Sequence, residues 1–503
     1  MLFINGKFYT EEGFQEAVLI EEGKFKRMGS TKKLLEDYPD SEIIDLNKKL
    51  VLPGFNDSHL HLLSFERFFN AINLDQVDSV PEIIKLGKEA LNEKEILILY
   101  NYDDSLFKDS LICRDLDEIS CVIPIIAYRA CGHIAVVNSK ALEKLPNFNS
   151  NLLNRETGTL KEDALGLLEE LYPEASVEQL KEKIKKTIKF FNSFGITSIG
   201  TNDLKDNLEE GKRIIAAYRE LDLEKSLNSR VSLQFSFTEI EKIEEVLKLR
   251  IDSSYFRFGP LKLFLDGSLG GKTALLSEPY PDDSYGIQTL ATEKLEELLA
   301  YSESRNLQVA VHSIGDVATE IFLQAFQKTC FKKLRHFLIH LQVLRKDLIS
   351  SLEKFKIPAS VQPIFIEEDM RIAKKLSPKL QKTSYAFKSL NQATKTSFSS
   401  DAPYGGLNPF RGIAAAISQA NSHNEELNPD EKMTIIDTIL AYTINSAYLT
   451  FEEDCKGRIA RGFYGDFIVL DQDIFLVPTN EIKNTKVEMT VLGGRVVYKK
   501  GEF

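Results

Sequence analysis

Two histidines separated by one residue follow an apolar run near the start of the chain. His59 and His61 end the segment LVLPGFNDSHLH, residues 50–61. In an extended strand, residues i and i+2 point to the same face, so the two imidazoles are expected to lie side by side. Imidazole nitrogens are common ligands of zinc and other transition metals. The pair therefore predicts a metal site at the end of a strand.

Four further residues with suitable chemistry lie in or just after later strand-like runs. His312 closes QVAVH, His340 closes FLIH, and Asp401 follows SFSS. Lys262 stands inside PLKLFLDGS, which is unusual because lysine is almost never fully buried unless it is paired. A lone histidine at a strand end is commonly a hydrogen-bonded core residue. Four histidines and one aspartate that all follow strands favour a metal-dependent active site instead.

The elements that must position these residues alternate between strand and helix patterns. Helical spacing is clear at Leu180, Ile184 and Ile188, among others. Eight strands alternating with helices predict an α/β fold, a (β/α)8 TIM-like barrel, in which the strand ends converge on the face that carries the active site. The predicted strands are the segment that ends at His61 and residues 196–199, 231–237, 261–265, 309–311, 337–340, 359–361 and 396–399.

Two smaller parts are predicted around the barrel. Residues 1–50 and 455–503 are rich in strands, which predicts a small β-sandwich formed by both termini and leaves 51–454 for the barrel. Within the first part, Asn5-Gly6 predicts a hairpin turn between two short strands. Residues 66–180, an insertion after strand one, are too many for a structureless loop and carry strand and helix patterns, so we expect an inserted lid domain.

The composition excludes several classes of partner. The net charge of −12 argues against nucleic acids and anionic membrane surfaces, which require basic patches. No apolar run approaches the ~20 residues of a membrane-spanning helix. The N-terminus shows no secretory signal pattern, and the five cysteines are scattered without C-x-x-C spacing. We therefore expect reduced thiols and a cytoplasmic protein.

On these motifs, the sequence resembles the amidohydrolase superfamily of metal-dependent hydrolases, and in particular the amidohydrolase-3 branch that includes N-substituted formamide deformylases. The resemblance covers nearly the whole chain, and it implies the same barrel, terminal sandwich and insertion. The segments that carry it are PGFNDSHLHL (53–62), RACGHIAVVNSKAL (129–142), GITSIGTND (195–203), LKLFLDGSLGGKTALL (261–276), VAVHSIGD (309–316), RHFLIHLQ (335–342), SVQP (360–363), SSDAP (399–403) and GRIARGFYGDFIVLD (457–471).

The resemblance also implies a ligand set. By position, His59, His61 and Asp401 would hold one divalent metal ion, and His312 and His340 a second. Imidazole and carboxylate ligands favour Zn²⁺, although Fe, Mn and Co also suit them. Asp401 is the expected catalytic base, which takes a proton from the attacking water and passes it to the departing amine.

Lys262 aligns with a lysine that bridges two metal ions as an N-carboxylate in the binuclear branches. Carboxylation needs a neutral amine, so burial or nearby cations must lower the pKa of Lys262. Whether one or two ions bind stays open. Strand six departs from the family because Leu338-Ile339-His340 lacks the glutamate that relatives often have before this histidine, and the insertion reads Cys131-Gly132-His133 where many relatives have Asp-Gly-His.

The predicted activity is hydrolysis of a carbon–nitrogen bond in a small molecule, a non-peptide amide such as an N-acyl or N-formyl amine, by a metal-activated water. His133, Arg129 and Asp266 are the expected substrate-binding residues. A mononuclear deaminase or a lactonase-type hydrolase is the nearest alternative, and a non-catalytic binding protein on a hydrolase scaffold is the alternative from another class. The sequence leaves the substrate and the oligomeric state open, a homodimer included.

Overall fold

The computed structural model describes residues 1–69, 71–91, 95–103, 107–130, 132, 134–146, 152–172, 174–205, 207–329 and 331–501. Its centre is an eight-stranded sheet whose neighbouring strands are parallel and follow one another in chain order. This order confirms the predicted α/β barrel. The strands are β8 (Phe55–Leu60), β15 (Ile196–Leu204), β16 (Arg230–Phe235), β17 (Phe256–Phe264), β18 (Val309–Ser313), β19 (Phe337–His340), β20 (Ala359–Val361) and β21 (Thr396–Phe398).

The first and last strands of this sheet meet at their carboxyl ends. The Asp401 amide donates to the His59 carbonyl at 2.9 Å, and the His61 amide donates to the Ala402 carbonyl at the same distance. Deeper in the barrel, the Ser58 hydroxyl donates to the carbonyl of Phe398 at 3.0 Å. The contacts that close the barrel therefore also bring Asp401 beside the two histidines of β8.

Helices surround the sheet and bury one apolar face each, as α6 illustrates. Ser176 caps it by accepting from the Gln179 amide, while the Gln179 side chain accepts from the Ser176 amide. These helices are α2 (Leu62–Phe68), α6 (Val177–Asn192), α7 (Leu208–Leu223), α8 (Ile240–Lys248), α9 (Thr292–Arg305), α10 (Asp316–Thr329), α11 (Lys346–Phe355), α12 (Phe365–Ala373), α13 (Pro378–Gln381), α14 (Phe387–Ala393), α15 (Pro409–Ser418), α16 (Ile435–Ala441) and α17 (Ile444–Leu449), with the short 3-10 helix η3 (Pro429–Glu431).

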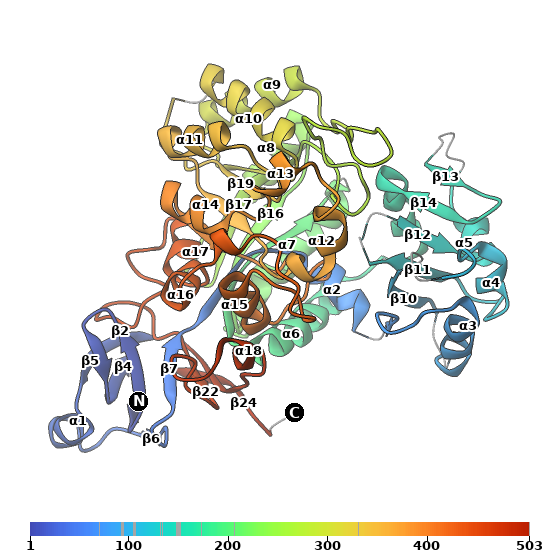
Figure 1. Ribbon diagram of the computed structural model, residues 1–503. Coiled ribbons are helices and arrows are strands. Elements are labelled where there is room, and N and C mark those ends of the chain that lie inside the picture. Colours follow the sequence, from blue (N-terminus) through green and yellow to red (C-terminus); the bar gives the residue numbers. More distant parts are fainter. Residues whose placement is uncertain are drawn as a thin grey trace.

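Two further sheets, one from the N-terminal segment alone and one from both terminal segments, lie together at one side of the barrel (Figure 1). One has the order β5-β4-β1-β6 and the other β24-β23-β22-β7-β2-β3. The elements are β1 (Leu2–Ile4), β2 (Lys7–Thr10), β3 (Gly13–Gln15), β4 (Ala17–Glu21), β5 (Lys24–Gly29), α1 (Thr31–Asp37), β6 (Ile43–Asp45), β7 (Leu50–Pro53), β22 (Phe467–Leu470), α18 (Thr479–Ile482), β23 (Val487–Leu492) and β24 (Arg495–Lys499).

The prediction of a hairpin at Asn5-Gly6 is wrong. β1 pairs with β4 and β6 in one terminal sheet, whereas β2 pairs with β3 and β7 in the other. Asn5 adopts a left-handed conformation (φ 52°), which the turn pattern anticipates, but the chain uses it to cross between the sheets. The pairing of each strand with strands distant in the sequence therefore determines the structure here, and the local turn pattern does not.

Strand alternation explains how the terminal sheets are stacked. Val51 of β7 and Phe467 of β22 lie in an apolar cluster with Phe3 of the other terminal sheet, which makes the two sheets a sandwich. Their neighbours Leu52 and Ile468 point the opposite way, into the cluster of the barrel and its helices. The central strands β7 and β22 of this sheet are therefore buried on both faces.

The segment between α2 and α6 forms a separate six-stranded sheet with the order β13-β14-β12-β11-β10-β9. In Figure 1 it stands on the side of the barrel away from the terminal sheets. One apolar cluster contains Leu97 and Ile125, and a different one contains Ile126 and Leu160. The elements are β9 (Ile72–Asn73), α3 (Val80–Glu89), β10 (Leu97–Tyr102), α4 (Cys113–Asp117), β11 (Ile125–Arg129), β12 (Ile134–Val137), α5 (Ser139–Lys144), β13 (Leu153–Asn154), β14 (Thr159–Lys161) and the 3-10 helix η2 (Glu162–Leu171).

Two expectations from composition concern membrane-spanning helices and the state of the cysteines. Within the described ranges, no helix is both long and apolar enough to cross a membrane. Cys113, Cys121 and Cys455 are free thiols. Cys131 and Cys330 lie outside the described residues.

Candidate metal centre

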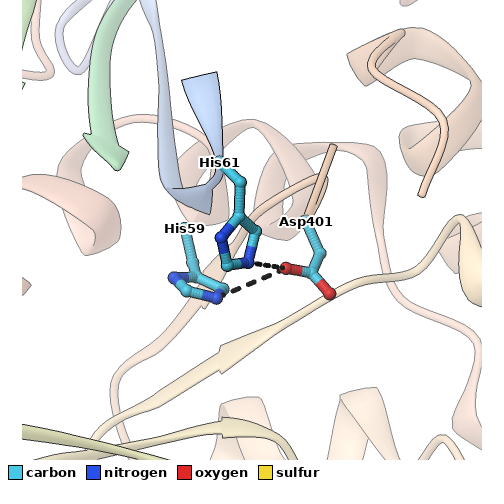
Figure 2. A group of neighbouring side chains, drawn as sticks. All are labelled: His59, His61 and Asp401. Atoms are coloured by element: carbon cyan, nitrogen blue, oxygen red, sulfur yellow. Dashed lines mark ion pairs between the residues drawn. The ribbon is translucent and has the colours of Figure 1, made fainter. Parts of the chain in front are cut away.

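The carboxyl ends of β8 and β21 bring His59, His61 and Asp401 to one point. Figure 2 shows both imidazoles directed toward the same carboxylate oxygen. Nε2 of His59 lies 3.3 Å from Oδ1 of Asp401, and Nε2 of His61 lies 3.2 Å from it. One donor atom from each of the three buried residues falls within 4.8 Å of the others. This is the convergence that the His-x-His pattern and Asp401 predict.

The donor set fits a divalent cation. Tetrahedral zinc, with bonds of about 2.0–2.1 Å, places neighbouring donor atoms about 3.3 Å apart, close to the separations between Asp401 and the histidines. Oδ1 of Asp401 is buried and accepts no hydrogen bond from any described residue. A buried carboxylate oxygen without a hydrogen-bond donor is costly, and a cation between the three groups would compensate it.

Burial keeps the imidazoles neutral, as metal ligands must be. It lowers the pKa of His59 to about 4 and that of His340 to about 3, although the charge of Asp401 acts in the opposite direction. The site therefore presents neutral nitrogens around one carboxylate anion.

Two glutamines fix the orientation of two histidines. Nδ1 of His59 lies 2.9 Å from Oε1 of Gln234, and Nδ1 of His340 lies 2.8 Å from Oε1 of Gln362. The Gln362 amide nitrogen donates to the Ser399 hydroxyl at 2.7 Å, so its oxygen faces the histidine. Both Nδ1 atoms must then carry protons, which leaves Nε2 as the nitrogen with a lone pair.

His61 and His312 use backbone carbonyls in the same way. Nδ1 of His61 lies 3.2 Å from the carbonyl oxygen of Asn202. His312 is turned around, because its Nε2 lies 3.0 Å from the Gly267 carbonyl oxygen and Nδ1 therefore carries the lone pair. The ring of His312 is 4.4 Å from that of His340, which in turn is 5.9 Å from that of His59. All four predicted histidines thus form one cluster.

Lys262 projects from β17 into the same cluster. Its side chain is 1% exposed, and its Nζ makes no hydrogen bond to any described residue. Burial lowers the pKa of Lys262 to about 7, against the charges of Asp401 and Asp266. A substantial neutral fraction therefore exists near neutral pH, which is the form that reacts with carbon dioxide.

Two residues of this centre have strained backbone conformations. His340 and Asp401 both adopt left-handed conformations, with φ of 83° and 55°. Such positions cost on the order of 1–3 kcal/mol each and persist where the surrounding structure enforces them, which is typical of functional sites. Here barrel closure holds Asp401, and the contact with Gln362 holds His340.

Sequence reasoning missed the residues that brace the ligands. Asp57 accepts from the Ser400 amide at 3.0 Å, which ties β8 to the loop that carries Asp401. Burial raises the pKa of Asp57 to about 7 despite this hydrogen bond. Asp57 and Gln234 each lie in a barrel strand, and only the polar character of a residue in a buried run could have indicated them.

The three expected substrate-binding residues lie in different surroundings. Both oxygens of Asp266 are buried, and they accept from the amides of Ile314 (3.0 Å) and Gly315 (2.7 Å). Arg129 ends β11 and pairs with Asp103 at 3.6 Å. His133 lies outside the described residues. A role in substrate binding stays a prediction for all three.

Converging histidines and an aspartate at the carboxyl ends of a (β/α)8 barrel define a class of metal-dependent hydrolases. The chain belongs to the amidohydrolase family, whose amidohydrolase-3 sequence model matches residues 42–498. It is therefore a hydrolase, as the resemblance implied, and its family acts on small molecules.

Individual relatives agree with this assignment. The chain is 32% identical to YtcJ of Bacillus subtilis, a protein that carries the name of an amidohydrolase, over 98% of each sequence. It is 21% identical to the N-substituted formamide deformylase of Arthrobacter pascens, over 96% of this chain and 95% of that one. A crystal structure of a metal-dependent hydrolase from Pyrococcus horikoshii superimposes with a TM-score of 0.82 at 29% identity, over 95% of this chain and 98% of that one.

Proposed function

We propose that this protein hydrolyses a carbon–nitrogen bond in a non-peptide amide, an N-acyl or N-formyl amine. The observation that carries the proposal is the convergence of neutral His59 and His61 on the unsatisfied Oδ1 of Asp401. The relative named as an N-substituted formamide deformylase supports the choice of bond.

His59, His61 and Asp401 would hold one divalent ion, and His312 and His340 a second. Lys262 would be shared between the two ions only as an N-carboxylate, formed from its neutral amine and carbon dioxide. Zn²⁺ suits this set of nitrogen and carboxylate donors. A bound ion would supply Lewis acidity for the scissile carbonyl and a water of lowered pKa.

The chain's own residues account for the proton transfer. The Asp401 side chain is largely withdrawn from bulk water, so its carboxylate would accept the proton of the attacking water and deliver it to the departing amine. Gln234 and Gln362 keep the protons of His59 and His340 on Nδ1, so that the lone pair of each ring stays on Nε2. Asp266 holds the loop after β18 through its backbone amides.

The first test of the reaction is a panel of N-formyl and N-acyl amines with the metal-loaded protein. Asp401→Asn should keep the fold and lower kcat about 10²- to 10⁴-fold, because it removes the base. Asp37→Asn, an exposed aspartate in α1, is the matched control and should leave kcat unchanged. If the metal-loaded enzyme hydrolyses none of these amides, the proposed choice of bond is rejected.

Metal content per chain tests the ligand set independently of the substrate. The wild-type protein should contain two equivalents, and Lys262→Ala should lower the content toward one. Equal stoichiometry in both proteins would reject Lys262 as a bridge.

A further inference from the structure

Phe264 stands at the mouth of the barrel directly above Lys262. It is the last residue of β17, and residues i and i+2 of a strand share a face. Lys262 points into the barrel with 1% of its surface exposed. Phe264 must therefore point the same way one step nearer the carboxyl end, yet it is 40% exposed. A large apolar side chain thus faces the open side of the site.

Contacts within the protein fix this ring. Nζ of Lys262 lies 3.8 Å from the Phe264 ring centroid, and the ring of His312 lies 5.5 Å away at 41°. The Phe264 carbonyl accepts from the Thr289 hydroxyl at 2.9 Å, which anchors the backbone. One side of the ring therefore covers two residues of the proposed metal centre, and the remaining surface is available to a ligand.

Single exposed apolar residues are common on protein surfaces and need no explanation by themselves. Phe331 is such a case, because it is 83% exposed in the connection between α10 and β19, at the amino end of the barrel strands. Phe264 differs from it in lying at the carboxyl ends of the strands and in touching site residues. Ligand pockets are lined mainly by apolar and aromatic groups, with a few polar groups that fix orientation.

We propose that Phe264 is a specificity-determining residue whose exposed face binds an apolar substituent next to the scissile bond. The reaction class rests on the proposed function above, whereas the apolar subsite does not. The substrates favoured by this geometry are amides with an alkyl or aryl group on the acyl or amine side, rather than small, fully polar amides.

A series of straight-chain alkyl hydroxamic acids tests the subsite without any hydrolysis. Their head groups bind a metal ion and their tails grow by one methylene at a time. In calorimetry with the metal-loaded wild-type protein, affinity should rise by up to about fourfold per added methylene over the first few members. Phe264→Ala should flatten this rise, Phe264→Leu should keep most of it, and Phe331→Ala should behave as wild type. An unchanged rise in Phe264→Ala overturns the proposal.

A second series in the wild-type protein needs no variant. Hydroxamic acids of the same length that end in a hydroxyl group should lose most of the gain, and equal affinity of the two series also overturns the proposal. If no amide is hydrolysed but the alkyl series behaves as expected, the proposed reaction fails and the subsite stands. If amides are hydrolysed and affinity does not depend on chain length, the reaction stands and the subsite fails.

Discussion

Individual side chains at this centre are held by neutral acceptors. Metal-binding histidines commonly donate their second nitrogen to a carboxylate or a carbonyl, which orients the ring and raises its basicity. Here Gln362, just after β20, accepts from Nδ1 of His340 at the end of the neighbouring strand β19. Its amide nitrogen also donates to Ser399, so a carboxylate at this position would lose a donor that the neighbouring strand needs.

Replacing Gln362 should weaken metal binding. Gln362→Leu removes the acceptor for Nδ1 of His340, and we expect about 10- to 100-fold lower affinity. Gln362→Glu should also bind more weakly, because its carboxylate cannot donate to Ser399. Competition with a chromogenic chelator measures the effect. The control is Gln324→Leu, at an exposed position of α10. Equal metal affinity in the wild type, both Gln362 variants and this control would contradict the role of Gln362 as the acceptor for His340.

Glu452 gives stability a defined dependence on pH. Burial raises its pKa, but the charges of Lys456 and Arg257 outweigh this and lower it to about 2. A carboxylate whose folded pKa is depressed stabilises the fold above its unfolded pKa, which is about 4.3, and the contribution is lost as the pH falls toward 2. The full contribution is about 3 kcal/mol.

Thermal unfolding of the wild type and Glu452→Gln between pH 2 and 6 tests this. The difference in midpoint should be largest above about pH 5 and should shrink toward pH 2, where the wild-type carboxyl becomes protonated as well. A difference that does not change with pH would show that charge is not the cause. Glu481→Gln, on the surface in α18, is the control and should show no such trend.

Among the elements, the sequence was sufficient where the information is local. The eight apolar runs have strand-like lengths and helices between them, so β8 and β15 to β21 and their order could be predicted. The positions of His312, His340 and Asp401 could be predicted because each lies at or shortly after the carboxyl end of its strand. Gln234 and Gln362 could not, since they act only through contacts with side chains from other strands, and the pattern of a single strand does not encode the register between strands. The hairpin prediction at Asn5-Gly6 was wrong for a related reason, because the flanking strands pair with strands distant in the sequence and not with each other.

The carboxyl end of β15 positions the helix that follows His61. The Thr201 hydroxyl accepts from the Leu62 amide at 2.9 Å, and Asp203 accepts from the Leu63 amide at 3.0 Å. These acceptors satisfy the otherwise unpaired amides at the start of α2, as a capping residue does. Asp203 also accepts a hydrogen bond from the hydroxyl of Tyr218 at 2.8 Å, and this contact fixes the orientation of its carboxylate.

Asp203→Ala should therefore loosen the start of α2 and, through it, His61. We expect a loss of about 1–2 kcal/mol in stability and metal affinity lowered about tenfold. Hydrogen exchange at the amides of residues 62–64, with and without metal, separates the two effects. Tyr218→Phe keeps the carboxylate and should have a smaller effect on both. Unchanged exchange in Asp203→Ala would contradict a positioning role.

At the scale of the whole molecule, a buried ion pair joins the terminal sheets to the barrel in addition to their apolar packing. Arg230, the first residue of β16, donates from Nε and Nη2 to the carboxylate of Asp466, at 2.6 and 3.0 Å. The side chains are 4% and 5% exposed. Asp466 also accepts from the Gly493 amide at 2.7 Å in the turn between β23 and β24. The pair thus joins a barrel strand to the sheet that both termini build.

Asp466→Asn should destabilise the molecule strongly, because it leaves the guanidinium of Arg230 buried without a counter-charge. Removing one partner of a buried pair costs about 3–5 kcal/mol, far more than the pair contributes relative to apolar residues. Arg230→Met in the Asp466→Asn background should recover part of the loss, since no buried charge then remains. The midpoint of thermal unfolding measures both variants, and Asp37→Asn, in the exposed pair with Lys33, should leave it unchanged. A double variant less stable than Asp466→Asn would mean that Arg230 stabilises the junction through its stacking on Tyr464 and Tyr255 rather than through its charge.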